Sequence, residues 1–108
     1  MKTNNVLLIG YVGVDPTITS TKKGQKKALI RMATHMPKKN EKGGKTLDTV
    51  WHNVIAFDAA AAYAEQGFVK GSKILVDGRI DYRRYQDQTG QTRYITSIVA
   101  DSVLNLDR

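Results

Sequence analysis

The segment Trp51-His52-Asn53-Val54-Ile55-Ala56-Phe57 predicts a β-strand that carries two large aromatic rings. Side chains alternate between the two faces of a strand, so the odd-numbered residues, Trp51 and Phe57 included, share one face. That face also carries polar Asn53, and in a basic protein such a mixed surface suits the stacking of nucleic-acid bases. Two aromatic rings can equally fill a hydrophobic core, so this strand alone leaves both interpretations open.

The charge of the chain favours a polyanionic partner. The 17 Lys and Arg residues outnumber the 10 Asp and Glu residues, which gives a net charge of +7 over 108 residues. Nine of these positive charges lie between Lys22 and Lys45, where only Glu41 opposes them. A basic run is often only a solvated surface, but together with aligned aromatic residues it indicates nucleic-acid binding.

The rest of the sequence predicts an all-β fold with a single domain over residues 1–108. Strands are expected over residues 6–12, 27–34, 49–57, 73–85 and 92–104. Asp58 is expected to be the N-cap of a short alanine-rich helix over residues 59–66. Residues 36–46 contain glycines, a proline and several lysines, and we expect a basic loop or hairpin there. Five strands with a helix between the third and the fourth are the order of an OB-fold Greek-key barrel.

Several other classes of protein fit the sequence poorly. The chain has no Cys and only two His, so neither a thiol nucleophile nor a metal site is expected. Gly43-Gly44-Lys45-Thr46 resembles the end of a phosphate-binding loop, but Lys39 stands where the motif requires Gly. No apolar run is long enough for a membrane helix and no signal-peptide pattern is present, so we expect a cytoplasmic protein. We expect neither enzymatic activity nor a cofactor.

The order and spacing of short motifs along nearly the whole chain provide a more specific indication. These motifs are Asn5–Gly10, Gly13–Pro16, Ala33-Thr34, Thr49–Phe57, Lys70–Lys73, Val76–Arg79 and Asp87–Tyr94. Together they resemble the DNA-binding domain of bacterial single-stranded DNA-binding proteins. The resemblance implies sequence-independent binding and protection of single-stranded DNA in replication, recombination and repair. It also implies a homotetramer, although a dimer is possible.

The resemblance assigns expected roles to individual residues. Trp51, Phe57 and Tyr85 are expected to stack on bases, although Tyr85 could simply be a surface residue beside a turn. Contacts to phosphates are expected from Arg31, Lys38, Lys39, Lys42, Lys45, Lys70, Lys73, Arg79, Arg83 and Arg84. His52 is expected at a subunit interface, with a hydrogen bond inside its own subunit as the alternative.

The sequence departs from the family pattern at two places. The family often has a further stacking Trp near the position of Lys38, so charge is expected to replace a ring there. Typical members also continue into a tail with an acidic tip, whereas this sequence stops at Leu106-Asp107-Arg108. The tail is either removed or naturally absent, so the given residues do not support partners recruited through it.

Two alternative functions keep the same fold. One is a tailless, usually dimeric, OB-fold adaptor of primosomal replication restart, and the other is an RNA-binding OB-fold domain.

Overall fold

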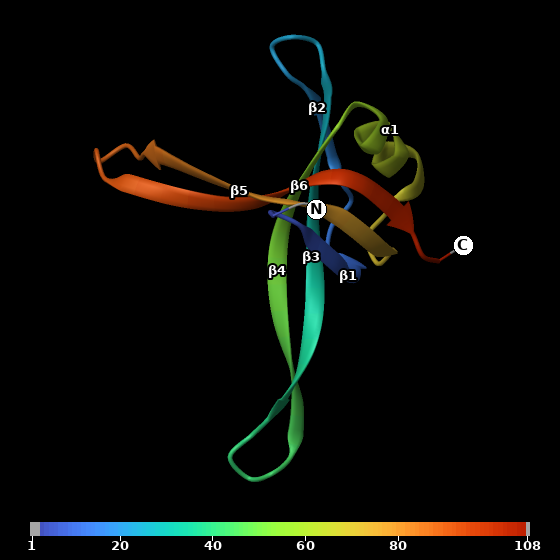
Figure 1. The fold of residues 1–108 in the computed structure, drawn as a ribbon, viewed down its shortest axis with the longest axis vertical. Coiled ribbons are helices and arrows are strands. Elements are labelled where there is room, and N and C mark those ends of the chain that lie inside the picture. The colour runs from blue at the N-terminus through green and yellow to red at the C-terminus, as the bar shows by residue number, and fades with distance from the viewer. Residues whose placement is uncertain (1–2, 108) are drawn as a thin grey trace.

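The computed structural model describes residues 3–107, so both ends of the predicted 1–108 domain (residues 1, 2 and 108) lie outside it. Its elements, in chain order, are β1 (Val6–Val12), β2 (Thr17–Ser20), β3 (Lys26–Lys39), β4 (Lys45–Phe57), α1 (Asp58–Gly67), β5 (Lys73–Gln86) and β6 (Thr92–Asn105) (Figure 1). All five predicted strands and the helix are present. The sequence analysis missed β2, because four residues between Pro16 and a turn are too few for a clear alternating pattern.

The strands form one sheet that closes into a barrel. The sheet order is β1-β5-β6-β4-β3-β2, and an additional pairing joins β1 to β3. This closing contact pairs Tyr11 with Ala33 and Val12 with Met32. Only β4 and β6 pair in parallel; the other strand pairs of the described residues are antiparallel. The five strands β1, β3, β4, β5 and β6 therefore make the predicted OB-fold barrel, and β2 adds an edge outside it.

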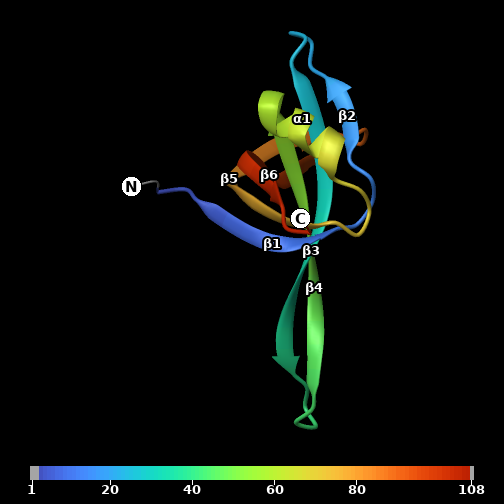
Figure 2. The ribbon, with the colours of Figure 1, turned by 90° about the vertical axis from the view of Figure 1, so that its right-hand side faces the viewer.

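Even-numbered side chains of the central strands fill the barrel, as the alternation of strand faces requires. The largest fully buried side chains are Ile30, Met32, Val54, Ile74 and Val76. α1 lies over one end of the barrel (Figure 2), where Ala61, Ala64 and Phe68 complete the core. Because the even positions of β3 and β4 point inward, their odd positions form an outer face of the barrel.

Two glycines allow barrel strands to approach closely. A Cβ atom on Gly10 would clash with the carbonyl oxygen of Ala33, at the place where β1 meets β3. A Cβ atom on Gly78 would clash with the carbonyl oxygen of Val99, next to a β-bulge between Asp77 and Gly78. Glycine at these positions lets the sheet bend and close, as bulges and glycines do in small barrels.

The start of α1 differs from the prediction. The N-cap residue is Phe57, and Asp58 is the first helical residue, with a positive φ of 54°. No side chain caps this helix; the Asp58 carboxylate instead accepts a hydrogen bond of 2.7 Å from Nε2 of Gln25. The expectation that Asp58 caps the helix is therefore wrong, because its carboxylate bonds to the turn before β3.

Two long hairpins project from the barrel, and the molecule measures 53 × 44 × 33 Å along its principal axes. The β3–β4 arm, residues 35–49, points downward in Figure 1, and the β5–β6 arm, residues 81–96, points to the left. Every residue of the β3–β4 arm is exposed. The predicted basic loop at residues 36–46 is thus a hairpin, with strands to Lys39 and from Lys45 around a short turn.

Candidate nucleic-acid interface

The outer face of β3 and β4 holds both aromatic residues of the strand with which the sequence analysis began. Four consecutive cross-strand pairs make up this face, which we call the outer strip: Lys27–Phe57, Leu29–Ile55, Arg31–Asn53 and Ala33–Trp51. Trp51 is 49% exposed and Phe57 is half-buried, so neither ring is enclosed in the core. The two rings mark opposite ends of a strip about 20 Å long, at roughly 3.3 Å per residue.

The indole of Trp51 is held in place by its neighbours. The guanidinium carbon of Arg31 lies 5.2 Å from the ring centroid, within the range of a cation–π contact. Nη1 of Arg31 also donates a hydrogen bond of 3.2 Å to Oδ1 of Asn53. On another side the ring lies against Gly13, where a Cβ atom would clash with Cζ3 and lie 2.8 Å from Cη2 of the indole. Glycine at position 13 therefore lets the indole lie down on the sheet surface.

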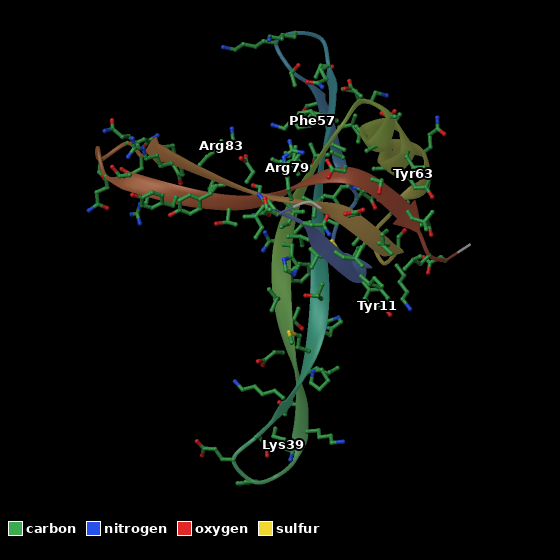
Figure 3. The ribbon with its side chains drawn as sticks, in the orientation of Figure 1. Tyr11, Lys39, Phe57, Tyr63, Arg79 and Arg83 are labelled. Atoms are coloured by element: carbon green, nitrogen blue, oxygen red, sulfur yellow. The ribbon has the colours of Figure 1, made fainter. Side chains whose placement is uncertain are left out.

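A groove of about 360 Å³ follows the outer strip beneath the β5–β6 arm. Leu29 and Ile55 line it from β3 and β4, and Arg83 and Ile95 line it from the arm. Arg31 also lines the groove, so guanidinium groups are available on both sides of an apolar floor. In Figure 3, Arg83 extends along β5 between the barrel and the tip of the arm. Such a lining offers contacts both to flat apolar surfaces and to anions.

The β5–β6 arm adds aromatic rings to both of its faces. Tyr85 is 48% exposed, and it lines a smaller hollow of about 250 Å³ together with Arg83, Arg84 and Ile95. On the other face Tyr82 and Tyr94 stack on each other, with centroids 5.3 Å apart and planes at 14°. The sequence analysis did not select Tyr82, Tyr94 or Ile95. Their sequence signal is the alternation of rings along two paired strands, which becomes evident only when the cross-strand register is known.

A turn built around Asp87 fixes the tip of this arm. The Asp87 carboxylate accepts hydrogen bonds from the backbone N–H groups of Thr89 and Gln91 and from the Thr89 hydroxyl. It also accepts a bond of 2.9 Å from Nε of Arg93. The Thr89 hydroxyl and the Arg93 guanidinium are the main reasons why the pKa of Asp87 falls to about 2.

The predicted lysines of the β3–β4 arm divide between its two faces. Lys39 and Lys45 are a cross-strand pair on the face that continues the outer strip. Lys38 lies on the opposite face, where its Nζ is 3.6 Å from the Asp48 carboxylate. Lys42 lies in the turn, next to Asn40, whose side-chain oxygen accepts bonds from two backbone N–H groups. Like charges directly opposite each other repel, so the Lys39–Lys45 pair favours an anion between them.

The remaining predicted basic residues lie away from the groove. The backbone N–H of Lys70 donates to the Asp15 carboxylate, and Lys73 begins β5 opposite Tyr11 of β1. Arg79 is bound to Asp101 through Nη1 at 3.1 Å. None of these three lines the groove, whereas Arg84 lines the smaller hollow beside Tyr85. The structure therefore brings Arg31, Arg83 and Arg84 together with the rings and leaves Lys70, Lys73 and Arg79 apart from them.

His52 lies at the base of the β3–β4 arm on the face opposite to Trp51. Its Nε2 and the Thr34 hydroxyl share a hydrogen bond of 2.9 Å. Burial lowers the pKa of His52, because the charged imidazolium loses solvation there. The bond within its own subunit, the alternative of the sequence analysis, is thus present, and the role at a subunit interface stays a prediction.

Comparison with known proteins identifies the family. Residues 3–106 match the single-strand binding protein family. This chain belongs to that family. It is 39% identical over 98 residues to a single-stranded DNA-binding protein of Rhizobium meliloti, an alignment that covers 89% of this chain and 56% of the relative. It is 37% identical over 100 residues to a single-stranded DNA-binding protein of Xylella fastidiosa, with 93% and 61% of the two chains covered.

The family fold is shared by a distant solved structure. The Plasmodium falciparum SSB, solved in complex with single-stranded DNA, superposes with a TM-score of 0.88 at 25% identity, over 99% of this chain and 97% of that one. The chain spans only 56% and 61% of the lengths of the two curated relatives. The agreement with the SSB structure covers the barrel and both arms, since it includes nearly every residue.

Two further features of the structure concern ligands and membranes. Among residues 3–107, no group of three His, Asp or Glu side chains is placed to hold a metal ion. The helix found in this same range is too short and too polar to cross a membrane.

Proposed function

We propose that this protein binds single-stranded DNA without sequence preference and so protects it during replication, recombination and repair. One observation carries the proposal: the exposed ring of Trp51 and the half-buried ring of Phe57 lie at the two ends of an outer strip whose groove is flanked by Arg31 and Arg83. The membership of the family and the names of its relatives support it. We propose that it does so in the cytoplasm.

The proposed mechanism separates bases from phosphates. Every base has a flat π face, so stacking on Trp51, Phe57 and Tyr85 is insensitive to sequence and contributes about 1–3 kcal/mol per base. Arg31, beside the indole, and Arg83, across the groove, are placed to neutralise phosphates. Such contacts release counterions and make affinity depend on salt. No bond is formed or broken, so the function needs neither a catalytic residue nor a cofactor.

The basic residues would act at different distances from the rings. Arg31, Arg83 and Arg84 would contact phosphates within and beside the groove. Lys39, Lys42 and Lys45 would extend the basic path along the β3–β4 arm, with Lys38 on its other face. We keep Lys70, Lys73 and Arg79 as contacts for a longer strand that passes around the barrel.

The alternatives of the sequence analysis are less well supported. An adaptor of replication restart needs protein contacts more than exposed rings, and the similar proteins bear names that state single-stranded DNA binding. An RNA-binding domain would use the same stacking chemistry. Competition between oligo-dT and oligo-U of equal length therefore distinguishes RNA from DNA, since only RNA offers a 2′-hydroxyl.

We further propose assembly into a homotetramer through the outer face of β1, β5 and β6. Leu7, Ile9 and Leu104 are exposed on these strands. Leu75 of β5 pairs with Ile9 of β1 and with Leu104 of β6, so it connects the apolar residues of the three strands. Asp77 pairs with Leu7, and its buried Oδ1 has no hydrogen-bond partner among the described residues. An apolar surface of this kind, with an unsatisfied acceptor, suits contact with a second copy. His52 lies on β4 and not on this face, so we propose it as a residue of a separate contact between subunits.

Sedimentation of the wild-type chain and of Ile9→Lys tests this assembly. We expect a tetramer for the wild type and a smaller species for the variant, because a charge would have to be buried in the contact. A wild-type monomer would contradict the assembly proposal, and a dimer would favour the adaptor.

Trp51 itself provides the test of DNA binding. Oligo-dT should quench the emission of Trp51, because it is the one tryptophan of the chain and would stack directly on a base. Trp51→Ala should weaken binding by about 1–3 kcal/mol, whereas the matched control Trp51→Phe should retain most of the affinity. Unchanged emission at saturating oligo-dT would remove Trp51 from the site. Matched duplex DNA should compete poorly, since its base faces are covered.

A further inference from the structure

We propose that Tyr11 and His35 form a second stacking platform for a base, directly beside Trp51 and on the side away from the groove. This inference rests on the proposed binding of single-stranded DNA and extends the binding site. Neither residue is among the site residues that the family resemblance implied. The platform formed by Tyr11 and His35 would hold one further base of the bound DNA strand. The phosphate next to that base would lie near the lysines of the β3–β4 arm.

The register of three strands brings Tyr11 next to Trp51. Tyr11 of β1 pairs with Ala33 of β3, and Ala33 pairs in turn with Trp51 of β4. These three residues therefore form one row on the outer surface, with the small Ala33 in the middle. The indole also reaches the Gly13 position two residues beyond Tyr11, since a Cβ atom there would clash with it. The indole therefore reaches across β3 toward β1, and Ala33, between Trp51 and Tyr11, is only 5% exposed.

His35 completes the platform from the next row of the same face. His35 pairs with Thr49, one row further along the β3–β4 arm than the Ala33–Trp51 pair. Its Nδ1 and the Thr49 hydroxyl are 3.1 Å apart, which fixes the orientation of the imidazole. The rings of Tyr11 and His35 have centroids 6.0 Å apart and planes inclined at 42°. Because the two rings are tilted and not stacked, each keeps exposed surface for a base; Tyr11 is 43% exposed.

The surface beyond this pair suits a polyanion. The same face continues through the Pro37–Leu47 pair to the Lys39–Lys45 pair. A strand that leaves Trp51 in this direction would meet the two rings first and then two ammonium groups. The labels of Tyr11 and Lys39 in Figure 3 mark the start and the end of this path. Bases on rings and phosphates on lysines are the combination that single-strand binding surfaces use.

Lys38 does not contribute to the face of the β3–β4 arm that continues from Trp51. Lys38, at the position where we expected charge to replace a family tryptophan, lies on the opposite face and pairs with Asp48. It is therefore not available to a strand that lies across Trp51. The Tyr11–His35 pair supplies a ring surface on the correct face instead, one row from Trp51.

The binding test compares substitutions that remove a ring with one that retains it. Tyr11→Leu and His35→Ala should each weaken binding of a long oligo-dT by at least about fivefold, the lower end of the loss of one base stack. Tyr11→Phe keeps the ring and should leave the affinity unchanged. Because both rings would serve one base, the double variant should lose less than the sum of the single losses. Equal affinity of wild type and Tyr11→Leu, with Trp51→Ala still weakened, would overturn the inference.

Two further measurements separate this inference from its rivals. Oligo-dT that contains 5-iodouracil should photocrosslink to the peptide that contains Tyr11, and the absence of any crosslink to Tyr11 or His35 would contradict the platform. Tyr11 also follows Leu7 and Ile9 on β1, so sedimentation must show the same oligomer for Tyr11→Leu as for the wild type. A changed oligomer would assign Tyr11 to subunit assembly and overturn the inference. A wild-type protein that fails to bind oligo-dT would instead refute the proposed function.

Discussion

The two arms of this protein offer a strand of nucleic acid different kinds of contact. The β3–β4 arm ends in lysines, of which Lys39 and Lys45 face each other and form no ion pair among those found for residues 3–107. The β5–β6 arm carries tyrosines and arginines, and an Asp87-centred turn with four hydrogen bonds closes its tip. The β3–β4 arm therefore offers mainly ammonium groups, and the β5–β6 arm offers rings together with guanidinium groups.

This difference indicates a division of labour. Flexible, hydrated ammonium groups attract phosphates over a distance and are screened by salt. Rings that neighbouring side chains hold in place act only on contact, and salt affects their stacking little. We expect the β3–β4 arm to govern the salt dependence of binding and the β5–β6 arm to govern its contact energy.

The largest effect is expected from neutralising the lysines of the β3–β4 arm. The triple variant Lys39→Gln, Lys42→Gln and Lys45→Gln should make the slope of log affinity against log salt less negative by about 2, at about 0.7 per phosphate contact. If affinities converge near 1 M salt, the variant should bind about a hundredfold more weakly at 0.1 M. Titration of labelled oligo-dT at several salt concentrations measures the slope.

Lys38→Gln provides the matched control for this experiment. It removes the same charge from the same arm, but from the opposite face and from a pair with Asp48. Its slope should stay close to that of the wild type. Lys38→Gln could instead change the slope by about one third of the change seen in the triple variant. The position of a lysine on the arm would then not matter, and the lysines would act only as a diffuse charge.

The second largest effect should come from the ring of the β5–β6 arm. Tyr85→Ala should weaken binding by about 1–3 kcal/mol at every salt concentration, because the substitution removes a stack and no charge. Tyr85→Phe keeps the ring and should behave like the wild type. Parallel lines in the salt titration would support the division between the arms, and a changed slope would argue against it.

The strand pattern made much of this arrangement predictable. Alternation along Trp51–Phe57 placed both rings on one face, and the register of β3 and β4 confirms that they share it. The sequence could not show that Tyr11 reaches that face, because the β1–β3 pairing forms only where the barrel closes. Nor could it show on which side of the hairpin Lys38 lies, since residues 36–46 were not recognised as strands.

The prediction of the helix start was wrong because of a contact that is distant in the sequence. An Asp before an alanine-rich helix has the usual signature of an N-cap, but here Gln25 binds its carboxylate from a turn far away in the sequence. Likewise, the stacked Tyr82–Tyr94 pair depends on two strands being aligned. Contacts of this kind depend on tertiary structure, and propensities along one strand carry no information about them.

A smaller, local effect is expected at the tip of the β5–β6 arm. Asp87→Ala removes the acceptor that orders the turn, so the amide protons of Thr89 and Gln91 should exchange faster. Asp87→Asn retains one acceptor oxygen and should cause a weaker increase. Because the pKa of Asp87 in the folded chain, about 2, lies below its usual value of 3.8, the carboxylate stabilises the turn above pH 3.8 and stops doing so as the pH falls through 2. Exchange rates that respond to neither substitution would mean that backbone bonds alone hold the tip.

The smallest effect concerns the base of the β3–β4 arm, where His52 meets Thr34. Burial lowers the pKa of His52 below 6.5, so the unfolded chain binds a proton that the folded chain resists. The folded state should therefore lose stability as the pH falls through 6.5, and the loss should level off below the folded pKa. His52→Asn can keep a hydrogen bond to Thr34 but does not titrate, so its stability should change less between pH 7.5 and pH 5. Urea denaturation of both proteins at the two pH values measures this double difference, and identical pH dependences would show that His52 does not couple folding to pH.

Since the imidazole lies on the face opposite to Trp51, His52→Asn should also leave the quenching by oligo-dT at pH 7.5 unchanged. This control separates the stability of the β3–β4 arm from its contact with DNA.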